Sequence, residues 1–303
     1  MDGLSAAQSG EKLFARDDWP HRLGPFEALG QRYEVWTDDG ALARLLSSLY
    51  APMASPHGTE AAVYRVVTPR VGSKGTVLRN DLVIGERHSA AGVLELLQWA
   101  INRQVIEGSC VDRILLHAGA VSRDGVAVVL PAAMESGKTT LTTGLLDRGC
   151  EYLTDEAAAV DRDLTVTGYP KPLSIDPGAW EVLTHHRPHL EPALDGYLDR
   201  QWLVPVVPIA AVAGRARLGA VVLPRYEAQA PTRVERLSGA AALTALAHCT
   251  FVPEDATMPV GHVGQLSAIV HAVPVHRMVS GDLAEACAAV LDVLDGTLST
   301  ATS

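Results

Sequence analysis

The stretch Ser136-Gly137-Lys138-Thr139-Thr140 decides how this chain is expected to fold. It follows an apolar run, Val126-Ala127-Val128-Val129-Leu130, that is typical of a buried strand, and it precedes a segment with helical character, residues 141–148. A strand, a short loop and a helix in this order bring the backbone N–H groups of the helix N-terminus to the loop, where they attract anions. The stretch therefore predicts a phosphate-binding P-loop.

Each side chain of this stretch has an expected role in binding a nucleoside triphosphate. Gly137 lets the backbone approach the phosphates, Lys138 brings a positive charge to the β- and γ-phosphates, and Thr139 offers a hydroxyl ligand to Mg²⁺. Ser136 and Thr140 complete the set of residues that we expect to bind ATP.

The match to the full P-loop pattern is imperfect. Ala132 stands where the pattern has glycine, five residues before Gly137. Glu135 places a carboxylate beside the expected triphosphate, and the two negative groups repel each other unless a cation lies between them. A weakened or altered nucleotide site is therefore an alternative interpretation of the loop.

Asp155-Glu156 is the second informative feature. It ends an apolar strand, Tyr152-Leu153-Thr154, one helix downstream of the loop. In a P-loop sheet this position places carboxylates at the carboxyl edge, beside the phosphates. There a carboxylate can hold Mg²⁺, and one can accept the proton of an attacking hydroxyl. The alternative is a solvated pair at a strand end, but together with Thr139 the pair predicts a magnesium site.

His117 lies within an apolar run, residues 113–121, that is typical of a buried strand. Arg123-Asp124-Gly125 then predicts a hairpin turn into the strand before the loop. A lone histidine in such a strand is usually a core residue. Its place on the strand antiparallel to the one before the loop also allows it to face the phosphates.

Taken together, these segments resemble the catalytic core of HPr kinase/phosphorylase. The matching segments are Leu116-His117-Ala118-Gly119-Ala120-Val121, Leu130-Pro131, Ser136 to Leu141, and Tyr152 to Glu156. They look still closer to the HPr-kinase-like proteins of peptide natural-product clusters, such as lasso-peptide kinases. The resemblance covers residues 112–180 well and the rest of the chain weakly, and the related phosphoenolpyruvate carboxykinases share its order of elements.

The resemblance implies catalytic roles for Asp155, His117 and Lys138. Asp155 matches the first acid of the family's pair, which serves as a base or metal ligand, and His117 matches the histidine beside the reacting phosphate. Glu156 stands where the family has a second aspartate. Lys171 is implied as a further phosphate contact. The implied cofactors are ATP and Mg²⁺, with Thr139, Asp155 and Glu156 as metal ligands.

Composition limits the other function classes. The chain has 303 residues, 48% of them hydrophobic and 5% aromatic, and a net charge of −10. An acidic chain with few aromatic residues is not expected to bind nucleic acid or a membrane surface. The first residues show no basic stretch followed by an apolar one, so we expect a soluble, cytoplasmic protein.

Neither the cysteines nor the clustered histidines predict a further metal site. The four cysteines are scattered and lack zinc-ligand spacing, so we expect reduced thiols. His185, His186 and His189 have no carboxylate or cysteine at metal-ligand spacing, and we interpret them as an exposed helix end.

The predicted fold is α/β, with a P-loop core of the HPr kinase/phosphoenolpyruvate carboxykinase type. We expect a small α+β lobe over residues 1–108 and a kinase-like domain over residues 109–303. In the lobe, residues 76–84 predict one strand, and Ser89 predicts the start of a helix. Residues 180–186 predict a short helix in the second part. Homo-oligomers are common among the proteins that this chain resembles.

The function expected from these features is ATP-dependent transfer of a phosphoryl group to a hydroxyl. The expected acceptor is a serine of a peptide or protein, or a small molecule, in peptide natural-product biosynthesis. HPr itself is not expected, because the Arg-Gly-Leu-Gly type of recognition segment is not visible. Two alternatives stay open: a degenerate nucleotide-binding accessory or scaffold protein, and a phosphorylase or phosphatase on the same core.

Overall fold

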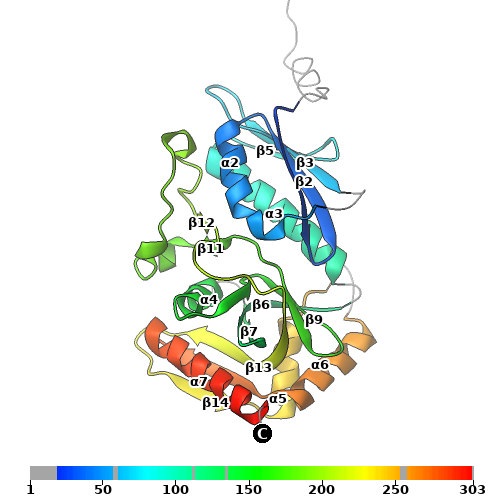
Figure 1. Cartoon of the computed structure of the whole chain (residues 1–303), viewed down its shortest axis with the longest axis vertical. Helices are drawn as coiled ribbons and strands as arrows, with labels where there is room; N and C mark the ends of the chain where they lie inside the picture. Colours follow the sequence, from blue (N-terminus) through cyan, green and yellow to red (C-terminus); the bar gives the residue numbers. More distant parts are fainter. Residues whose placement is uncertain (1–18, 57–60, 111–112, 134–135, 253–257, 302–303) are drawn as a thin grey trace, which may run out of the picture.

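The computed structural model describes residues 19–56, 61–110, 113–133, 136–252 and 258–301. Sheets and covering helices make a mixed α/β fold, as the sequence predicts (Figure 1). Within this described part, no helix is both long and apolar enough to cross a membrane. The predicted boundary between residues 108 and 109 falls at the end of a long helix that joins two sheets.

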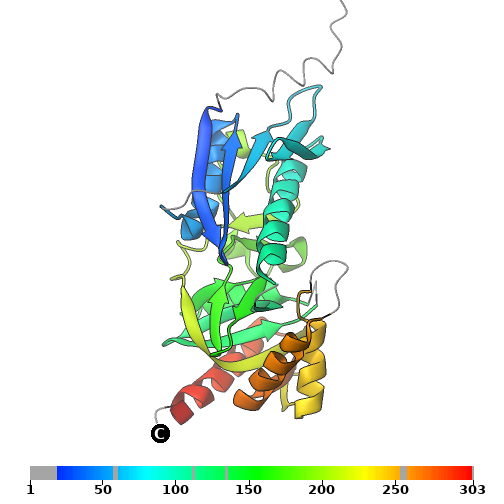
Figure 2. The ribbon, with the colours of Figure 1, turned by 90° about the vertical axis from the view of Figure 1, so that its right-hand side faces the viewer.

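The first sheet is formed by the N-terminal part of the chain, and its five strands lie side by side in the order in which they follow in the sequence. They are β1 (His21–Ala28), β2 (Gln31–Thr37), β3 (Ala62–Val67), β4 (Gly75–Arg79) and β5 (Leu82–Arg87). Helices α2 (Gly40–Leu49) and α3 (Ala90–Ser109) share one apolar core with it (Figures 1 and 2). This core continues into Leu115, Ala159 and Tyr169 of the second part, so apolar packing joins the two parts.

Two local predictions for this region have opposite outcomes. Ser89 is confirmed as the N-cap of α3, because its Oγ accepts a hydrogen bond from the Gly92 N–H at 3.1 Å. The single strand expected over residues 76–84 is wrong. Asn80 and Asp81 adopt left-handed backbone conformations, with φ of 47° and 71°, and turn the chain into a hairpin between β4 and β5.

The second sheet carries the segments that the sequence analysis singled out. Its strands are β6 (Ile114–Arg123), β7 (Val126–Pro131), β8 (Glu151–Thr154), β9 (Ala157–Val160), β10 (Thr165–Gly168), β13 (Arg215–Tyr226), β14 (Arg233–Arg236) and β15 (Val275–Ser280). Strands β7, β13 and β15 are parallel, whereas β6 runs antiparallel to β7, β8 and β9. Strand β10 pairs with both β9 and β13, so this side of the sheet curls back on itself.

Helices cover both faces of the second sheet. Helices α4 (Lys138–Leu146) and α7 (Leu283–Ala301) pack on one face, and α5 (Gly239–His248) and α6 (Val260–Ala272) pack on the other (Figure 1). A two-stranded sheet of β11 (Leu173–Ile175) and β12 (Trp202–Val204) lies beside α4. Each face of the sheet is therefore buried, as the continuous apolar strands require.

The helix expected over residues 180–186 is wrong. The segment forms turns that end in a single 3₁₀ turn, Thr184–His186. The Thr184 hydroxyl donates to the carbonyls of Trp180 and Glu181, and such bonds compete with helix extension. Pro177 and Pro188 also bracket the segment, which leaves it too short for a helix that is stable by itself.

Strand register places the candidate residues at one level of the sheet. On β6, Ala118 is paired with Pro131 of β7, and His117 is paired with Ala157 of β9. The loop after β7 and the bend between β8 and β9 therefore flank the same point of β6. That bend consists of Asp155 and Glu156.

A substitution at Gly168 tests how closely β10 approaches β8, the strand that leads to this bend. A Cβ at Gly168 would overlap the backbone of Leu153, whereas a Cβ at Gly178 would meet open space. We expect Gly168→Ala to destabilise the protein by about 1–3 kcal/mol or more, because backbone atoms cannot move aside cheaply. Denaturant unfolding measures the change. Equal stability of Gly168→Ala and the control Gly178→Ala would show that the strands do not approach this closely.

Candidate active site

The Gly-Lys loop, residues 132–137, joins β7 to α4. Gly137 is the N-cap of α4 and adopts a left-handed conformation with φ of 85°, which favours glycine. The Leu141 N–H donates to the Gly137 carbonyl at 2.9 Å and begins the helical hydrogen bonding. The N–H groups of the first turn of α4 have no partner within the helix, so this end is suited to an anion.

Lys138 is turned into the loop. Its side chain is 7% exposed, and Nζ donates to the carbonyls of Ala132 at 3.0 Å and Ala133 at 2.6 Å. Burial lowers the pKa of this ammonium. Nearby, the buried Ser136 hydroxyl has no hydrogen-bond partner among the described residues. The loop thus holds a buried ammonium that is paired with two carbonyls and a buried hydroxyl without a partner among the described residues.

The two departures from the P-loop pattern have different outcomes. Ala132 does not adopt a left-handed backbone conformation, so glycine is not required there by backbone geometry. Ala132 is buried, and its N–H donates to the His117 carbonyl at 3.3 Å. Glu135 lies outside the described residues.

Asp155 links the loop helix to the strand that ends beside it. The Thr139 hydroxyl donates to Asp155 Oδ2 at 3.0 Å. The Tyr152 hydroxyl lies 2.8 Å from Oδ1, and the Ser174 N–H donates to Oδ2 at 3.3 Å. The Asp155 residue is only 3% exposed, so its charge is held by these donors and by Lys171.

Lys171 lies between the two carboxylates of the bend. Its Nζ is 3.0 Å from Asp155 Oδ1, 3.7 Å from Glu156 Oε2 and 2.8 Å from the Ser174 hydroxyl. The side chain is 1% exposed. Burial alone lowers the pKa of Lys171, but the two carboxylates outweigh it and raise the pKa, so the ammonium stays charged. Lys171 therefore forms ion pairs with both acids in this structure, and its expected contact with a phosphate stays a prediction.

Glu156 and His117 form the more accessible side of the site. Their side chains are 28% and 20% exposed, and His117 Nε2 lies 4.0 Å from Glu156 Oε1. Burial raises the pKa of Glu156, so its protonated form is more populated than that of a glutamate in water. Burial, with a contribution from Lys138, lowers the pKa of His117 to about 4. The imidazole is therefore neutral at pH 7.

The structure brings together most residues that the sequence singled out. The contacts described above connect six of them: His117, Lys138, Thr139, Asp155, Glu156 and Lys171. Ser136 lies in the loop, and Thr140 lies on the first turn of α4. Sequence reasoning missed Tyr152 and Ser174 as partners of Asp155. No motif marks either residue, because their role follows from packing against Asp155.

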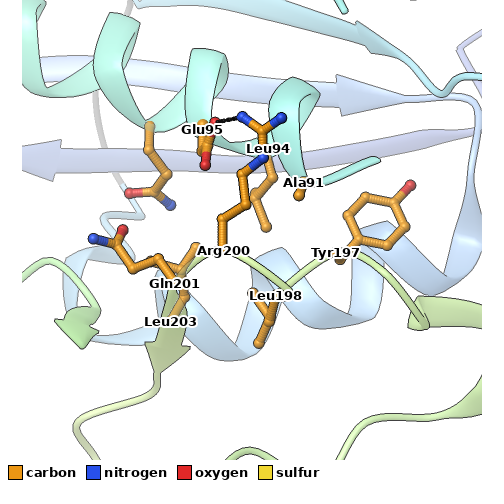
Figure 3. Close-up of a pocket in the computed structure, with 9 residues that line it drawn as sticks. Ala91, Leu94, Glu95, Tyr197, Leu198, Arg200, Gln201 and Leu203 are labelled. Carbon is orange, nitrogen blue, oxygen red and sulfur yellow. Dashed lines mark hydrogen bonds and ion pairs between the residues drawn. The ribbon is translucent and has the colours of Figure 1, made fainter. Parts of the chain in front are cut away.

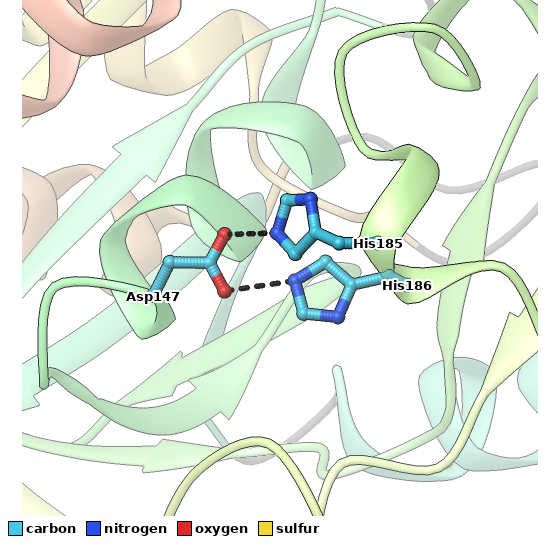
Figure 4. A group of neighbouring side chains, drawn as sticks. All are labelled: Asp147, His185 and His186. Atoms are coloured by element: carbon cyan, nitrogen blue, oxygen red, sulfur yellow. Dashed lines mark hydrogen bonds and ion pairs between the residues drawn. The ribbon is translucent and has the colours of Figure 1, made fainter.

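Two features lie apart from these residues. A small cleft between α3 and residues 197–203 is closed by the Arg200–Glu95 ion pair at 3.0 Å (Figure 3). Its volume of about 10 Å³ leaves room for no more than a water molecule. No carboxylate stands at metal-ligand spacing from His185 and His186 in the sequence, but in the fold Asp147 contacts both imidazoles (Figure 4).

Comparisons with known proteins give little further support. No family model matches the chain, and no curated protein matches it. Among solved structures, one match is the HPr(Ser) kinase/phosphatase from Coxiella burnetii. The sequences are 12% identical, the match covers 62% of this chain and 97% of the other, and the TM-score is 0.29. A TM-score this low carries no argument about function.

Removing Lys171 tests whether its ion pair with the acids holds this site together. We expect Lys171→Met to destabilise the protein by about 3–5 kcal/mol, because it leaves Asp155 buried without its cation. The double variant Lys171→Met/Asp155→Asn should recover part of this loss. Arg44→Met removes an exposed ion pair with Glu191 and should change stability little. Chemical unfolding compares the four proteins, and equal losses for both single variants would contradict the assignment.

The lowered pKa of His117 predicts a pH dependence of stability. The folded protein holds His117 neutral down to about pH 4, whereas the unfolded chain protonates it near its ordinary value of 6.5. Proton binding therefore favours the unfolded chain, and stability falls as the pH drops from 6.5 to 4. The loss relative to His117→Gln is at most about 3 kcal/mol, and urea unfolding across this range measures it. Parallel curves for both proteins would rule out a buried neutral imidazole.

Proposed function

We propose that the chain is an ATP-dependent phosphotransferase that transfers a phosphoryl group to a hydroxyl. The observation that carries the proposal is the hydrogen bond of 3.0 Å between Thr139 Oγ1 and Asp155 Oδ2. It joins the first turn of a helix that follows a Gly-Lys sequence to an acid at the end of a strand. In P-loop enzymes these two residue types hold Mg²⁺ together.

The residues around this bond suit Mg²⁺. Thr139, Asp155 and Glu156 supply a hydroxyl and two carboxylates, and Mg²⁺ prefers hard oxygen ligands. The Lys171 ammonium contacts both carboxylates, so an incoming Mg²⁺ competes with it for their negative charge. When bound, the ion supplies charge stabilisation to the phosphates. Lys171 must then share the carboxylates with it or turn toward a phosphate.

The Gly-Lys loop suits a nucleoside triphosphate. The start of α4, the Lys138 ammonium and the unpaired Ser136 hydroxyl are donors that can face anionic oxygens. Lys138 must exchange its two carbonyl partners for the phosphates, and that exchange replaces hydrogen bonds to neutral acceptors with hydrogen bonds to anionic oxygens. ATP and Mg²⁺ are therefore the cofactors that we propose.

The contacts favour a division of roles between the two acids. Asp155 accepts from Thr139, Tyr152, Lys171 and Ser174, so its oxygens are held at a fixed position beside the Thr139 hydroxyl, the other proposed metal ligand. Glu156 has fewer partners, is partly exposed and has a raised pKa, as a proton acceptor requires. We therefore assign metal binding to Asp155, and we transfer to Glu156 the proton-accepting role that the sequence analysis gave to Asp155.

His117 and the acceptor complete the proposal. A neutral His117 beside Glu156 can orient the acceptor hydroxyl without adding charge. We propose a serine of a peptide or protein, or a small-molecule hydroxyl, as the acceptor, in line with the resemblance of the site residues. The phosphorylase direction uses the same groups, because one transition state serves both directions of transfer.

A second candidate is a nucleotide-binding accessory protein without turnover. The contacts of Lys138 are consistent with such a degenerate site, because its ammonium is bonded to the loop carbonyls and a phosphate must displace them. Binding and turnover measurements separate this candidate from the first.

Titration calorimetry with ATP and Mg²⁺ tests the proposed site. We expect Lys138→Ala to weaken ATP binding by roughly 10–100-fold, because a hydrogen bond to a charged group contributes about 1.5–3 kcal/mol. Lys74→Ala, which removes a lysine of the first sheet paired with Glu86, should bind as the parent does. Equal affinities for the parent protein and Lys138→Ala, or no binding by the parent, would contradict the proposal.

Glu156→Gln then separates binding from chemistry. We expect it to bind ATP but to reduce phosphoryl transfer to serine-containing peptides, or release of ADP, by about 10²–10⁴-fold. Binding without turnover in the parent protein would favour the accessory function.

A further inference from the structure

A second cluster of ligand-type side chains lies at the other end of α4. Asp147 is the C-cap residue of this helix, and His185 and His186 belong to the 3₁₀ turn Thr184–His186. The imidazoles approach the carboxylate from one side, one to each oxygen (Figure 4). His185 Nε2 lies 3.0 Å from Oδ2, and His186 Nε2 lies 2.8 Å from Oδ1. Three ligand atoms thus converge from two separate segments.

The histidines are held in place by the packing of their segment. Leu183, next to the turn, is fully buried, and its N–H donates to the Ala179 carbonyl at 2.9 Å. Trp180 stacks on Trp202 of β12, with ring centroids 4.9 Å apart and planes 5° apart. The two imidazoles therefore stand on a backbone that is fixed to the core beside α4. Such support preorganises a site.

The chemistry of the cluster fits a zinc ion. Two imidazole nitrogens and one carboxylate oxygen form a ligand set that zinc uses in sites where water takes the fourth position. The three ligand atoms lie within 4.8 Å of one another, and the ring centroids of the histidines are 4.1 Å apart. No lysine or arginine in the described part of the chain forms an ion pair with Asp147.

Position and exposure favour a cation here as well. The C-terminal end of a helix carries a partial negative charge, which adds to that of Asp147. The His185 side chain is 59% exposed, so an ion can enter from solvent, whereas that of His186 is 9% exposed and anchors the site.

We propose that Asp147, His185 and His186 bind one zinc ion, which ties the C-terminal end of α4 to the segment before β12. Helix α4 begins at Lys138, directly after the Gly-Lys loop, so an ion at its C-terminal end restrains the helix that follows this loop. The site is separate from the Thr139–Asp155 region and does not depend on the proposed phosphotransferase activity. Without metal, the same three side chains pair by hydrogen bonds alone.

Zinc binding to the full chain, after treatment with a chelator, tests this proposal. Competition with a chromogenic chelator, in excess Mg²⁺ and without nucleotide, should show one zinc ion per chain. The double variant His185→Ala/His186→Ala should weaken binding by more than the roughly 10–100-fold that loss of an outer-shell partner costs. His189→Ala removes an exposed histidine three residues further on and should bind zinc as the parent does.

A second measurement separates loss of ligands from loss of fold. Zinc should raise the melting temperature of the parent, His189→Ala and Asp155→Asn proteins, but not that of the double histidine variant. Asp147→Asn keeps a hydrogen-bond acceptor for the imidazoles and should melt normally without metal, yet it should bind zinc more weakly. No stoichiometric zinc binding by the parent, or equal binding by the double variant, would overturn the proposal.

Discussion

The buried carboxylate of Asp155 is the constraint on which the site depends. A charge this deeply buried is stable only when donors surround it. Here the donors come from separate parts of the chain: Thr139 at the start of α4, Tyr152 on β8, and Lys171 and Ser174 around the start of β11. Satisfying this one carboxylate therefore fixes how the loop helix, the bent strand and the β11 segment lie relative to one another.

Lys171 decides the electrostatics around that carboxylate. Its ammonium stays charged because Asp155 and Glu156 outweigh the cost of burial. The pairing leaves the two acids unequal, since Asp155 is enclosed while Glu156 is partly exposed and has a raised pKa. Neighbouring carboxylates whose environments differ in this way can serve different chemical steps. The proposed division of roles, in which Asp155 holds a cation and Glu156 accepts a proton, rests on this difference.

Helix α4 connects this site to the second cluster. Its first residue is Lys138 and its C-cap is Asp147, so one short helix runs from the proposed phosphate site to the proposed zinc site. The helix packs on the core with α7 and residues near Trp180.

The sequence by itself determined the mixed α/β class, the strand before the loop and the pair of acids after the next strand, because apolar runs are local signals. It placed the helix after the loop at residues 141–148, whereas α4 begins at Lys138. It mispredicted the 76–84 strand and the 180–186 helix, where side-chain hydrogen bonds and turn residues override periodicity. Only the tertiary structure decided the partners of Asp155 and the meeting of Asp147 with His185 and His186. Apart from Tyr152, which is close to Asp155 in the sequence, these contacts join separate parts of the chain, and packing across the fold sets their distances.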